Sequence, residues 1–475
     1  MKWLRRPEFW FPIALLVGVG AGGRLLTSER CVHLSERDRS AYGQRPSWQA
    51  SFDALSATCG VGLLTYRLDQ DYTPAGRWVL AGLGVAGAVL YLAAARHMAA
   101  RMWPTGRERL PSTRLILAAF LAAQLLAILA VVLVERAGGA KTSVADSAWN
   151  AVSVFSSLGW LREPAGFRHT WIYAVVALAG ALGWPLWLVA WPQTLRLGGT
   201  VSRQRGRGEH ANTACPAFGE PDRAIRRGLL FATGSYIVFL LVGAGLVSVL
   251  EVPRGTPHGK PAVTDRLAGQ PELARYERAL TLVTCAAGAG VATEPLDDRS
   301  IGEGTKLVLA GVVLIGGLGG SAGGGLKWSL LVCASAALFG WRRKGPEMLG
   351  RASRFDLFRS AYAQLLLGLT LLVALGLLLI ESRTGSSYQA PPTLGDAVLD
   401  AASAVGGASL SSGLTATLTN VNLSAGIRQN VDLYQYGMTW LMLAMFLGRV
   451  LPVLVIGRFA DRHSPDEPAR PPQLI

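Results

Sequence analysis

Charged residues are scarce in this chain of 475 residues: Asp, Glu, Lys and Arg make up 16% of it, while apolar residues make up 51%. The mean hydropathy is positive. A chain with so few polar side chains cannot cover the surface of a soluble globular protein. The composition therefore excludes that class and predicts an integral membrane protein.

Cysteine and histidine are also few, and neither is clustered. The five cysteines show no spacing typical of pairing, and the six histidines fall singly in loops or at predicted helix ends. No metal site is indicated. No pair of nucleophile and base, no paired catalytic carboxylates and no phosphate motif stands out either. The sequence thus predicts neither an enzyme nor a bound cofactor.

Apolar runs of the roughly 20 residues that span a bilayer recur along the chain. They predict about eight transmembrane helices, the first of which we interpret as a retained helix rather than a cleaved signal peptide. The runs cover residues 9–27, 76–98, 113–134, 170–195, 228–250, 306–340, 357–380 and 436–458.

The formal charge of +15 does not indicate nucleic-acid binding, because the basic residues cluster beyond alternate ends of the apolar runs. By the positive-inside rule, that side is cytoplasmic, and both termini lie there. One of these basic segments, 196–227, is predicted to be a solvated cytoplasmic linker, and contact with a regulatory partner or anionic lipid is the alternative.

Four stretches between paired runs are too short to span a membrane, and they share a residue spacing. Each has a Ser or Thr followed six residues later by Gly or Ser. The pairs are Ser56 with Gly62, Ser153 with Gly159, Thr284 with Gly290, and Ser403 with Ser409. This internal repeat predicts four units of helix, re-entrant helix, loop and helix, with pseudo-fourfold symmetry around one central pore. Their bounds are 1–108, 109–200, 201–350 with the linker, and 351–475 with the tail.

Non-helical backbone at membrane depth is tolerated where it lines water. Four such loops would form a ring of carbonyls, which can replace the hydration shell of a monovalent cation. Close packing of small residues is the alternative for any single loop. Four loops at matching positions favour the filter.

A second glycine-rich stretch, Ile315–Trp328, interrupts the sixth apolar run with seven glycines in "IGGLGGSAGGGLKW". Each glycine costs a helix about 1 kcal/mol relative to alanine, so this glycine segment is predicted to be unwound. Inside a water-filled vestibule it would serve as a hinge and gate.

The four loops, the glycine segment and the closing "MFLGRVLPVLV" resemble the Trk/Ktr/HKT superfamily of potassium transporters over nearly the whole chain. The resemblance implies a pore-forming subunit in the plasma membrane of a bacterium, with potassium as its transported ion. It also implies a homodimer with a separate cytosolic nucleotide-binding RCK-type subunit, since the chain lacks a Rossmann fingerprint of its own.

The same resemblance implies site residues. Ion-binding carbonyls are expected in loop 1 (58–62), loop 2 (155–159), loop 3 (286–290) and loop 4 (405–409). Loop 1 gives Thr58, Cys59, Gly60, Val61 and Gly62; loop 2 gives Ser156, Ser157, Leu158 and Gly159; loop 3 gives Ala287, Gly288, Ala289 and Gly290; loop 4 gives Gly406, Gly407, Ala408 and Ser409. The gate residues are Gly316, Gly317, Gly319, Gly320, Ser321, Gly323, Gly324, Gly325 and Lys327.

Loop 4 departs from the family pattern, because Ser409 stands where a filter glycine is expected. A side chain there either costs about 1 kcal/mol in a glycine-like conformation or turns the carbonyl away. A shift of register in which Gly407 takes over is the alternative. Potassium stays the expected ion; a sodium-permeable or weakly selective transporter, or a non-conducting scaffold or sensor, are the other functions that the sequence allows.

Charges at membrane depth mark functional candidates. Arg449 is expected in the pore lining below the filter, with snorkelling to the interface as the alternative. Lys327 is either a gate charge or a cap on the broken helix. Four aspartates are expected at the outer starts of the re-entrant helices, capping them and drawing cations to the mouth. These are Asp53, Asp146, Asp396 and Asp400.

Overall fold

The computed structural model describes most of the predicted elements. The described residues are 6–33, 47–65, 68, 71–102, 112–139, 142–161, 170–190, 220–251, 272–291, 301–318, 321–328, 365–379, 393–412 and 431–461. Within these ranges the secondary structure is helical, and the one isolated β-bridge joins Val32 and Tyr72. The predicted linker 196–227 lies largely outside the described residues.

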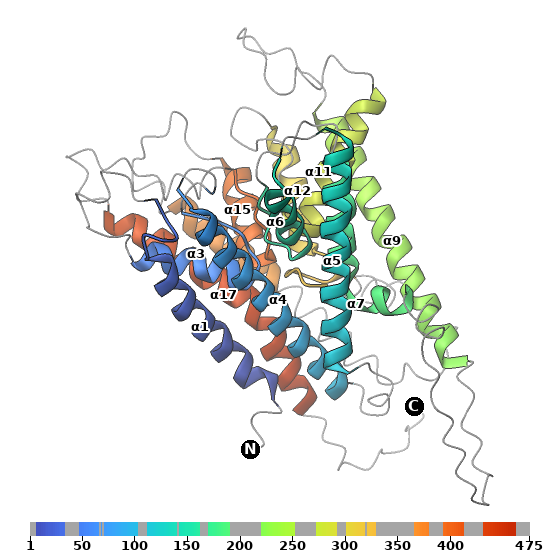
Figure 1. Ribbon diagram of the computed structural model, residues 1–475, viewed down its shortest axis with the longest axis horizontal. Helices are drawn as coiled ribbons and strands as arrows, with labels where there is room; N and C mark the ends of the chain where they lie inside the picture. Colours follow the sequence, from blue (N-terminus) through green and yellow to red (C-terminus); the bar gives the residue numbers. More distant parts are fainter. Residues whose placement is uncertain are drawn as a thin grey trace, which may run out of the picture.

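A helix occupies each of the eight apolar runs (Figure 1). These helices are α1 (Pro7–Leu26), α4 (Pro74–Met102), α5 (Thr113–Ala137), α7 (Thr170–Ala190), α9 (Glu220–Leu250), α12 (Glu303–Ile315), Leu365–Leu379 and α17 (Val431–Asp461). Among described residues, five of these are long and apolar enough to cross a membrane: α1, α4, α5, α9 and α17. The all-helical membrane architecture agrees with the prediction.

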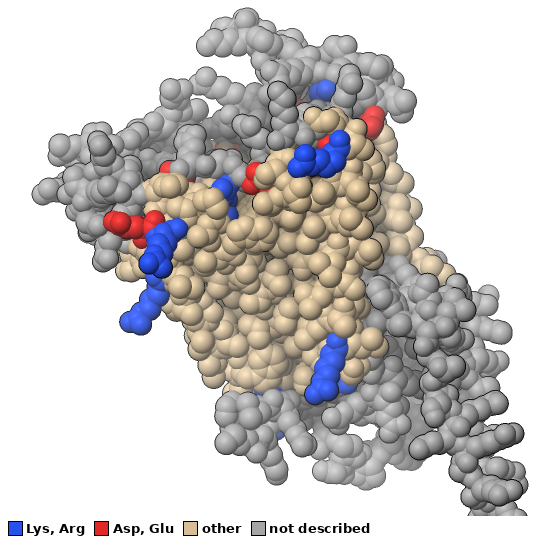
Figure 2. Space-filling model, in the orientation of Figure 1, with Lys and Arg blue, Asp and Glu red and all other residues tan. Residues whose placement is uncertain are grey.

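The surface of the helices has the pattern expected of contact with lipid. On α5, Leu121, Leu125 and Leu129 are exposed by 49% or more, while Phe120 and Val131 are fully buried. The exposed and the buried face of this helix are therefore both apolar, as expected for a helix in contact with lipid. Figure 2 shows the result as a broad uncharged band with charged side chains at its two ends.

Two of the runs depart from a continuous helix. In α7 the backbone at Gly183 has φ 72° and ψ 177°, which breaks the helix. After Ile315, α12 ends, and the described part of the glycine segment is not helical until Trp328. The predicted unwinding is therefore confirmed, while Gly319 and Gly320 lie outside the described residues.

Four short helices precede the predicted loops and lie together in the upper half of the bundle in Figure 1. They are α3 (Ser47–Cys59), α6 (Val144–Phe155), α11 (Glu272–Ala289) and α15 (Leu394–Gly406). Each packs against long helices of its own stretch of chain: α3 on α1 and α4, α6 on α5 and α7, α11 on α9 and α12, and α15 on α17. Contacts of α11 with α7, and of α15 with α12, join the neighbouring stretches.

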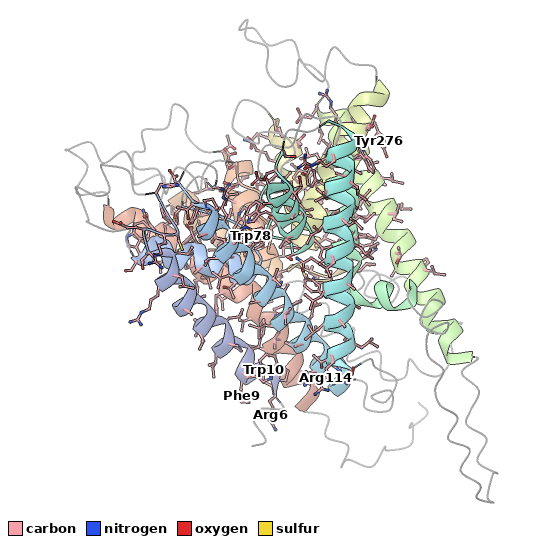
Figure 3. All side chains as sticks on the ribbon, viewed as in Figure 1. Arg6, Phe9, Trp10, Trp78, Arg114 and Tyr276 are labelled. Atoms are coloured by element: carbon pink, nitrogen blue, oxygen red, sulfur yellow. The ribbon has the colours of Figure 1, made fainter. Side chains whose placement is uncertain are left out.

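Basic residues occur at both ends of the helices: Arg24 and Arg136 lie in the last turns of α1 and α5, opposite Arg6 and Arg114. Arg6, just before α1, and Arg114, at the start of α5, lie at the same lower end of the bundle in Figure 3, whereas Tyr276 of α11 lies at the upper end. The short helices and their loops therefore lie in the half of the bundle opposite to Arg6 and Arg114.

Candidate functional site

The short helices end in a recurring backbone turn that explains the shared spacing. Val61 donates its N–H to the Ser56 carbonyl at 2.9 Å, Leu158 to Ser153 at 2.8 Å, and Ala408 to Ser403 at 3.0 Å. The residue before each donor has a positive φ: Gly60 at 67°, Ser157 at 61° and Gly407 at 69°. This is the six-to-one bond of a Schellman motif, which ends a helix with a residue in the left-handed region. The shared Ser is thus the acceptor from which the chain turns.

Loop 3 does not follow the other three loops. In α11 the helix continues through Ala289, and the left-handed residue is Gly290, with φ 65°. The bond that closes the turn there runs from the Val291 N–H to the Cys285 carbonyl at 3.2 Å, six residues back instead of five. Ala287 and Gly288 are consequently still helical, and Gly288 is so at the register where Gly60, Ser157 and Gly407 have already turned.

The four loops contact one another in chain order. Trp160, directly after loop 2, donates its indole N–H to the Gly62 carbonyl of loop 1. The Ser157 hydroxyl donates to the Gly288 carbonyl of loop 3 at 3.1 Å, and the Ser409 hydroxyl donates to the Gly290 carbonyl at 2.6 Å. A Cβ on Gly407 would lie 3.6 Å from the Gly60 carbonyl oxygen, which brings loop 4 back to loop 1. Segments spread over 350 residues therefore meet at one place.

Glycine is required at three of the contact points for a steric reason. A Cβ on Gly62 would overlap the Leu158 carbonyl oxygen, and one on Gly159 would lie 2.8 Å from the Ala289 carbonyl oxygen. Both residues, and Gly290, also have φ between 65° and 75°. A side chain at any of them would be strained in its backbone and would push the adjoining loop away.

Ser409 behaves differently from those glycines. Ser157 is the one non-glycine residue of the described chain with a positive φ, so Ser409 has an ordinary backbone conformation. The expected strain at Ser409 is therefore absent. Gly407 is left-handed at the position of Gly60 and Ser157, so it gives no sign of a shifted register. The Ser409 side chain lies against Gly62 and Gly159 as well as Gly290, between loops 1, 2 and 3.

The glycine segment folds back on itself directly against these loops. Leu326 donates its N–H to the Leu314 carbonyl at 2.8 Å, and Trp328 donates to Gly317 at 3.0 Å. A Cβ on Gly324 would lie 2.6 Å from the Gly406 carbonyl oxygen of loop 4, and one on Gly323 would lie 3.3 Å from the Ser157 hydroxyl of loop 2. The segment is thus in contact with the ends of two short helices.

Lys327 holds the segment in this shape. Its ammonium donates to the Ser321 hydroxyl at 2.8 Å, to the Gly324 carbonyl at 3.2 Å, and to the Gly323 carbonyl. These acceptors belong to the segment itself and not to the last turn of α12, which ends at Ile315. The contacts accordingly match a charge that fixes the folded segment, and they do not match a cap on the broken helix.

Arg449 is fixed from α17 at the same place. Its guanidinium donates to the Ala322 carbonyl at 2.8 Å and lies over the ring of Tyr91, 4.0 Å from the ring centre. The side chain is 3% exposed, which rules out snorkelling to the interface. A Cβ on Gly60 would lie 3.9 Å from the guanidinium, so the charge also lies next to loop 1.

Tyr91 of α4 is a residue that the sequence did not single out. It lies under two cations, since the Lys327 ammonium is 5.5 Å from its ring centre. An aromatic ring stabilises a nearby cation by its quadrupole, most strongly where water is excluded. A tyrosine inside an apolar run carries no sequence signal that distinguishes it from a core residue.

Two of the four aspartates cap short helices as predicted. Asp146 and Asp396 each lie in the first turn, where the side chain of the preceding N-cap residue, Ser143 or Thr393, accepts their N–H. The prediction is wrong for Asp53 and Asp400, which are each the seventh residue of their helix. Both are fully buried and accept hydrogen bonds from residues beyond the loops.

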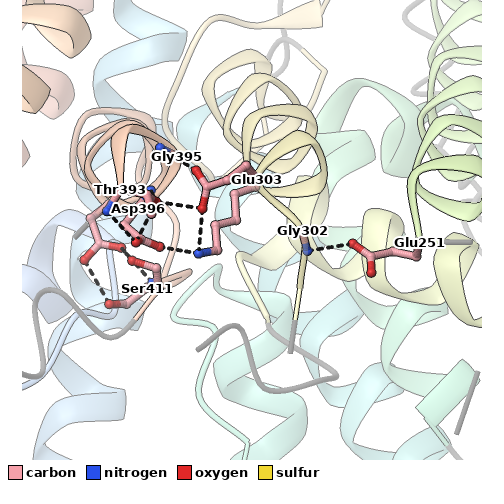
Figure 4. A network of polar contacts seen from close by, with 10 residues as sticks. Glu251, Gly302, Glu303, Thr393, Gly395, Asp396 and Ser411 are labelled. Carbon is pink, nitrogen blue, oxygen red and sulfur yellow. Dashed lines mark hydrogen bonds and ion pairs between the residues drawn. The ribbon is translucent and has the colours of Figure 1, made fainter. Parts of the chain in front are cut away.

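A buried ion pair next to Asp396 was also missed. Lys306 of α12 lies 2.6 Å from the Asp396 carboxylate and 3.2 Å from that of Glu303 (Figure 4). Glu303 in turn accepts from the Thr393 hydroxyl at 2.7 Å and from the Gly395 N–H at 3.0 Å. The network ties α12 to α15 above the loops. From sequence, Lys306 reads only as the polar start of an apolar run.

Four loops that follow short helices meet at one place, with an unwound segment and two cationic side chains packed against them, in a helical membrane protein. No model of a protein family matches this chain. No curated protein matches its sequence either. Among solved structures, the chain is similar to the potassium transporter TrkH from Vibrio parahaemolyticus, with a TM-score of 0.61 at 15% identity. The likeness covers 96% of this chain and 85% of the other. The chain therefore has a Trk-like fold, as its sequence predicted.

Proposed function

We propose that this chain carries potassium ions into the cell, passively, through a filter made by loops 1 to 4. The observation that carries the proposal is the meeting of the four loops, with left-handed residues that turn the backbone at the end of each short helix. Carbonyl oxygens arranged in such a ring can replace the hydration shell of a monovalent cation. The Trk-like fold supports the choice of potassium, because the similar structure is a potassium transporter.

In this proposal the glycine segment is the gate. Its contacts with loops 2 and 4, and the carbonyl bonds of Lys327 and Arg449, support a closed state in which backbone and positive charge lie across the path. Two fixed cations beneath the filter would repel an arriving potassium ion. Opening then requires the segment to leave its position under the loops.

The setting follows from the same reasoning. We place the protein in the plasma membrane, the inner membrane if the source is a bacterium, with both termini and the basic helix ends in the cytoplasm. The four pore units are residues 1–108, 109–200, 201–350 and 351–475. A homodimer and a separate RCK-type nucleotide-binding subunit are the proposed partners, and neither an enzymatic activity nor a cofactor is part of the proposal.

The proposal is tested by growth of a potassium-uptake-deficient bacterium on low external potassium, and by potassium flux into liposomes containing the purified chain. We expect Gly62→Ala to abolish both, because its Cβ would overlap the Leu158 carbonyl. The matched control is Gly82→Ala on α4, where a Cβ meets no atom within 4 Å, and it should behave as the parent chain. Absence of growth and of flux in the parent chain, with any partner, would favour a non-conducting scaffold or sensor.

A weakly selective or sodium-permeable transporter is the second candidate, and Ser409 is the observation that favours it. Its hydroxyl donates to the Gly290 carbonyl, so that carbonyl oxygen coordinates a cation less strongly. Its side chain also lies among Gly62 and Gly159, where the other loops present no side chain. The potassium-to-sodium flux ratio of the parent chain in the same liposomes distinguishes the two candidates.

A further inference from the structure

Asp53 and Asp400 are two buried carboxylates at the same register of the repeat. Each lies three residues before the shared serine, Ser56 or Ser403, and each side chain is 0% exposed. They lie in the middle of α3 and α15, so neither serves a helix N-terminus. Burying a carboxylate is unfavourable unless hydrogen bonds compensate for the lost water, which directs attention to what they bind.

Both carboxylates bind the residue twelve positions further on. Asp53 accepts the Thr65 N–H at 2.7 Å and the Thr65 hydroxyl at 2.8 Å. Asp400 accepts the Ser412 N–H at 2.8 Å and the Ser412 hydroxyl at 3.2 Å. The same bond, at the same register, occurs in two units that share little other sequence.

The hydrogen bonds of the two carboxylates connect to the chain just after loops 1 and 4. Thr65 and Ser412 lie three residues after Gly62 and Ser409, where the chain leaves loops 1 and 4. Each carboxylate therefore ties the exit of a loop to the middle of the helix that leads into it. Bonds to an ionised acceptor are roughly twice as strong as neutral ones. The loop between the two ends is thereby held at a fixed curvature.

Further donors reinforce each carboxylate. The Tyr72 hydroxyl donates to Asp53, and the Ser411 hydroxyl donates to Asp400 at 3.0 Å, as Figure 4 shows for Ser411. Tyr72 also belongs to the bridge with Val32, which anchors the Asp53 site to the segment after α1.

Loops 2 and 3 are held by other means. The residues at the register of Asp53 are Asn150 and Thr281. Asn150 donates to the Tyr173 hydroxyl of α7 at 3.1 Å, and Thr281 donates to the Glu277 carbonyl of its own helix at 2.9 Å. A carboxylate at this register is thus a feature of loops 1 and 4, which are adjacent to each other.

We propose that Asp53 and Asp400 are positioning residues of the filter: as anions they hold loops 1 and 4 at the curvature at which their carbonyls fit a dehydrated potassium ion. This rests on the proposed transport function. Without the anionic bonds, the two loops relax, and the ring loses the fixed spacing that separates potassium from the smaller sodium ion. Neither side chain touches the ion in this proposal.

The test is the potassium-to-sodium flux ratio of Asp53→Asn and Asp400→Asn in liposomes, on protein that is monodisperse in detergent. Each variant should lower the ratio by roughly tenfold, the effect of losing one charge-assisted bond. The matched control is Asp146→Asn, which changes a helix-capping aspartate in the second pore unit and should leave the ratio within about twofold. Thr65→Val, which removes one hydroxyl donor and keeps the carboxylate, should lower it by about twofold to threefold and serves if the asparagine variants fail to fold.

The outcomes separate the two proposals. A parent chain that moves no cation overturns the transport function, and the positioning role with it. The positioning role alone is overturned if the parent chain is selective and its flux ratio is kept in the variants Asp53→Asn, Asp400→Asn and Thr65→Val. A lower yield of folded protein with an unchanged ratio also overturns it, since that result assigns the carboxylates to stability only.

Discussion

At the scale of single residues, the largest difference between this chain and a ring of four glycines is Ser409. A left-handed backbone at this position would have made serine unfavourable, yet Ser409 has an ordinary φ and a hydroxyl that bonds the Gly290 carbonyl at 2.6 Å. The serine is therefore accommodated by its backbone, and its effect falls on the neighbouring carbonyl and on the space between loops 1 to 3.

We expect Ser409→Gly to raise the potassium-to-sodium flux ratio by about threefold to tenfold, because it frees the Gly290 carbonyl from a bond of about 1 kcal/mol. Ser409→Ala separates the two effects, since it removes the hydroxyl and keeps the Cβ. An unchanged ratio in both variants would mean that Ser409 is not at a filter position. The potassium-to-sodium flux ratio is measured from flux into liposomes under potassium and sodium gradients.

The ion pair of Lys306 and Asp396 gives a prediction about stability. Lys306 is fully buried, and Asp396 is 3% exposed at the side chain, so Lys306→Met removes the cation that compensates a carboxylate held away from water. Breaking one side of a buried pair costs about 3–5 kcal/mol. The thermal unfolding midpoint in detergent should fall accordingly.

Glu303→Gln is the control for that variant, because the Glu303 side chain is 49% exposed and water replaces much of its contact with Lys306. A pair near the surface contributes about 1 kcal/mol or less. Equal shifts of the midpoint in Lys306→Met and Glu303→Gln would contradict the assignment of the stability to the buried pair.

At the scale of elements, the glycine segment is the feature whose sequence and structure agree most directly. Seven glycines predicted an unwound chain, and the described residues show why alanine cannot replace them at the contact points. A Cβ on Gly325, which has φ 74°, would lie 2.6 Å from the Leu314 carbonyl oxygen. The folded segment therefore requires glycine for close approach and for backbone conformation together.

Gly325→Ala should destabilise this closed arrangement by about 1–2 kcal/mol. We therefore expect it to raise potassium flux roughly tenfold over that of the parent chain. The measurement is uptake of rubidium, as a tracer for potassium, into liposomes without a regulatory subunit. Gly311→Ala on α12, where a Cβ meets nothing within 4 Å, should leave uptake unchanged. A fall or no change in Gly325→Ala would argue that the segment does not close the pathway.

The short helices give a second result at this scale. Their turn chemistry is readable from sequence in loops 1 and 4, where glycine stands at the left-handed position. It is not readable in loop 2, where Ser157 adopts φ 61°, a conformation that costs a non-glycine residue about 1–2 kcal/mol. The bond of its hydroxyl to the Gly288 carbonyl offsets part of that cost, and it depends on loop 3 being present.

At the scale of the whole molecule, charge is distributed between the two ends of the bundle. Arg6 and Arg114 share the lower end in Figure 3, and the acidic side chains visible in Figure 2 lie at the upper end together with further Lys and Arg side chains. By the positive-inside rule, the basic segments of the sequence predict that the lower end is the cytoplasmic side. On that prediction the loops face the outside, where acidic residues would raise the local concentration of cations.

This orientation predicts where reporters function. Green fluorescent protein fused after residue 475 should fluoresce, because that domain folds in the cytoplasm and not beyond the membrane, while alkaline phosphatase at the same point should be inactive. Alkaline phosphatase inserted in the segment between α5 and α6, near residue 140, should be active. The reverse pattern would contradict the orientation and the direction of the proposed uptake.

The sequence by itself determined the class of molecule. Scarce charge and eight apolar runs dictated membrane helices, a recurring Ser and Gly spacing dictated the four short helices with their loops, and seven glycines dictated the break after Ile315. These features are local: each follows from the solubility or backbone freedom of residues close together in the chain. For this reason they could be predicted without knowing what lies next to them.

Only the tertiary structure decided which partners meet. It placed Tyr91 under Lys327 and Arg449, paired Lys306 with Asp396, and turned Asp53 and Asp400 from expected caps into ties behind two loops. It also gave Ser409 an ordinary backbone and placed its hydroxyl on the Gly290 carbonyl. Such pairings join residues from distant segments, and burial of charge fixes them only once the helices have packed.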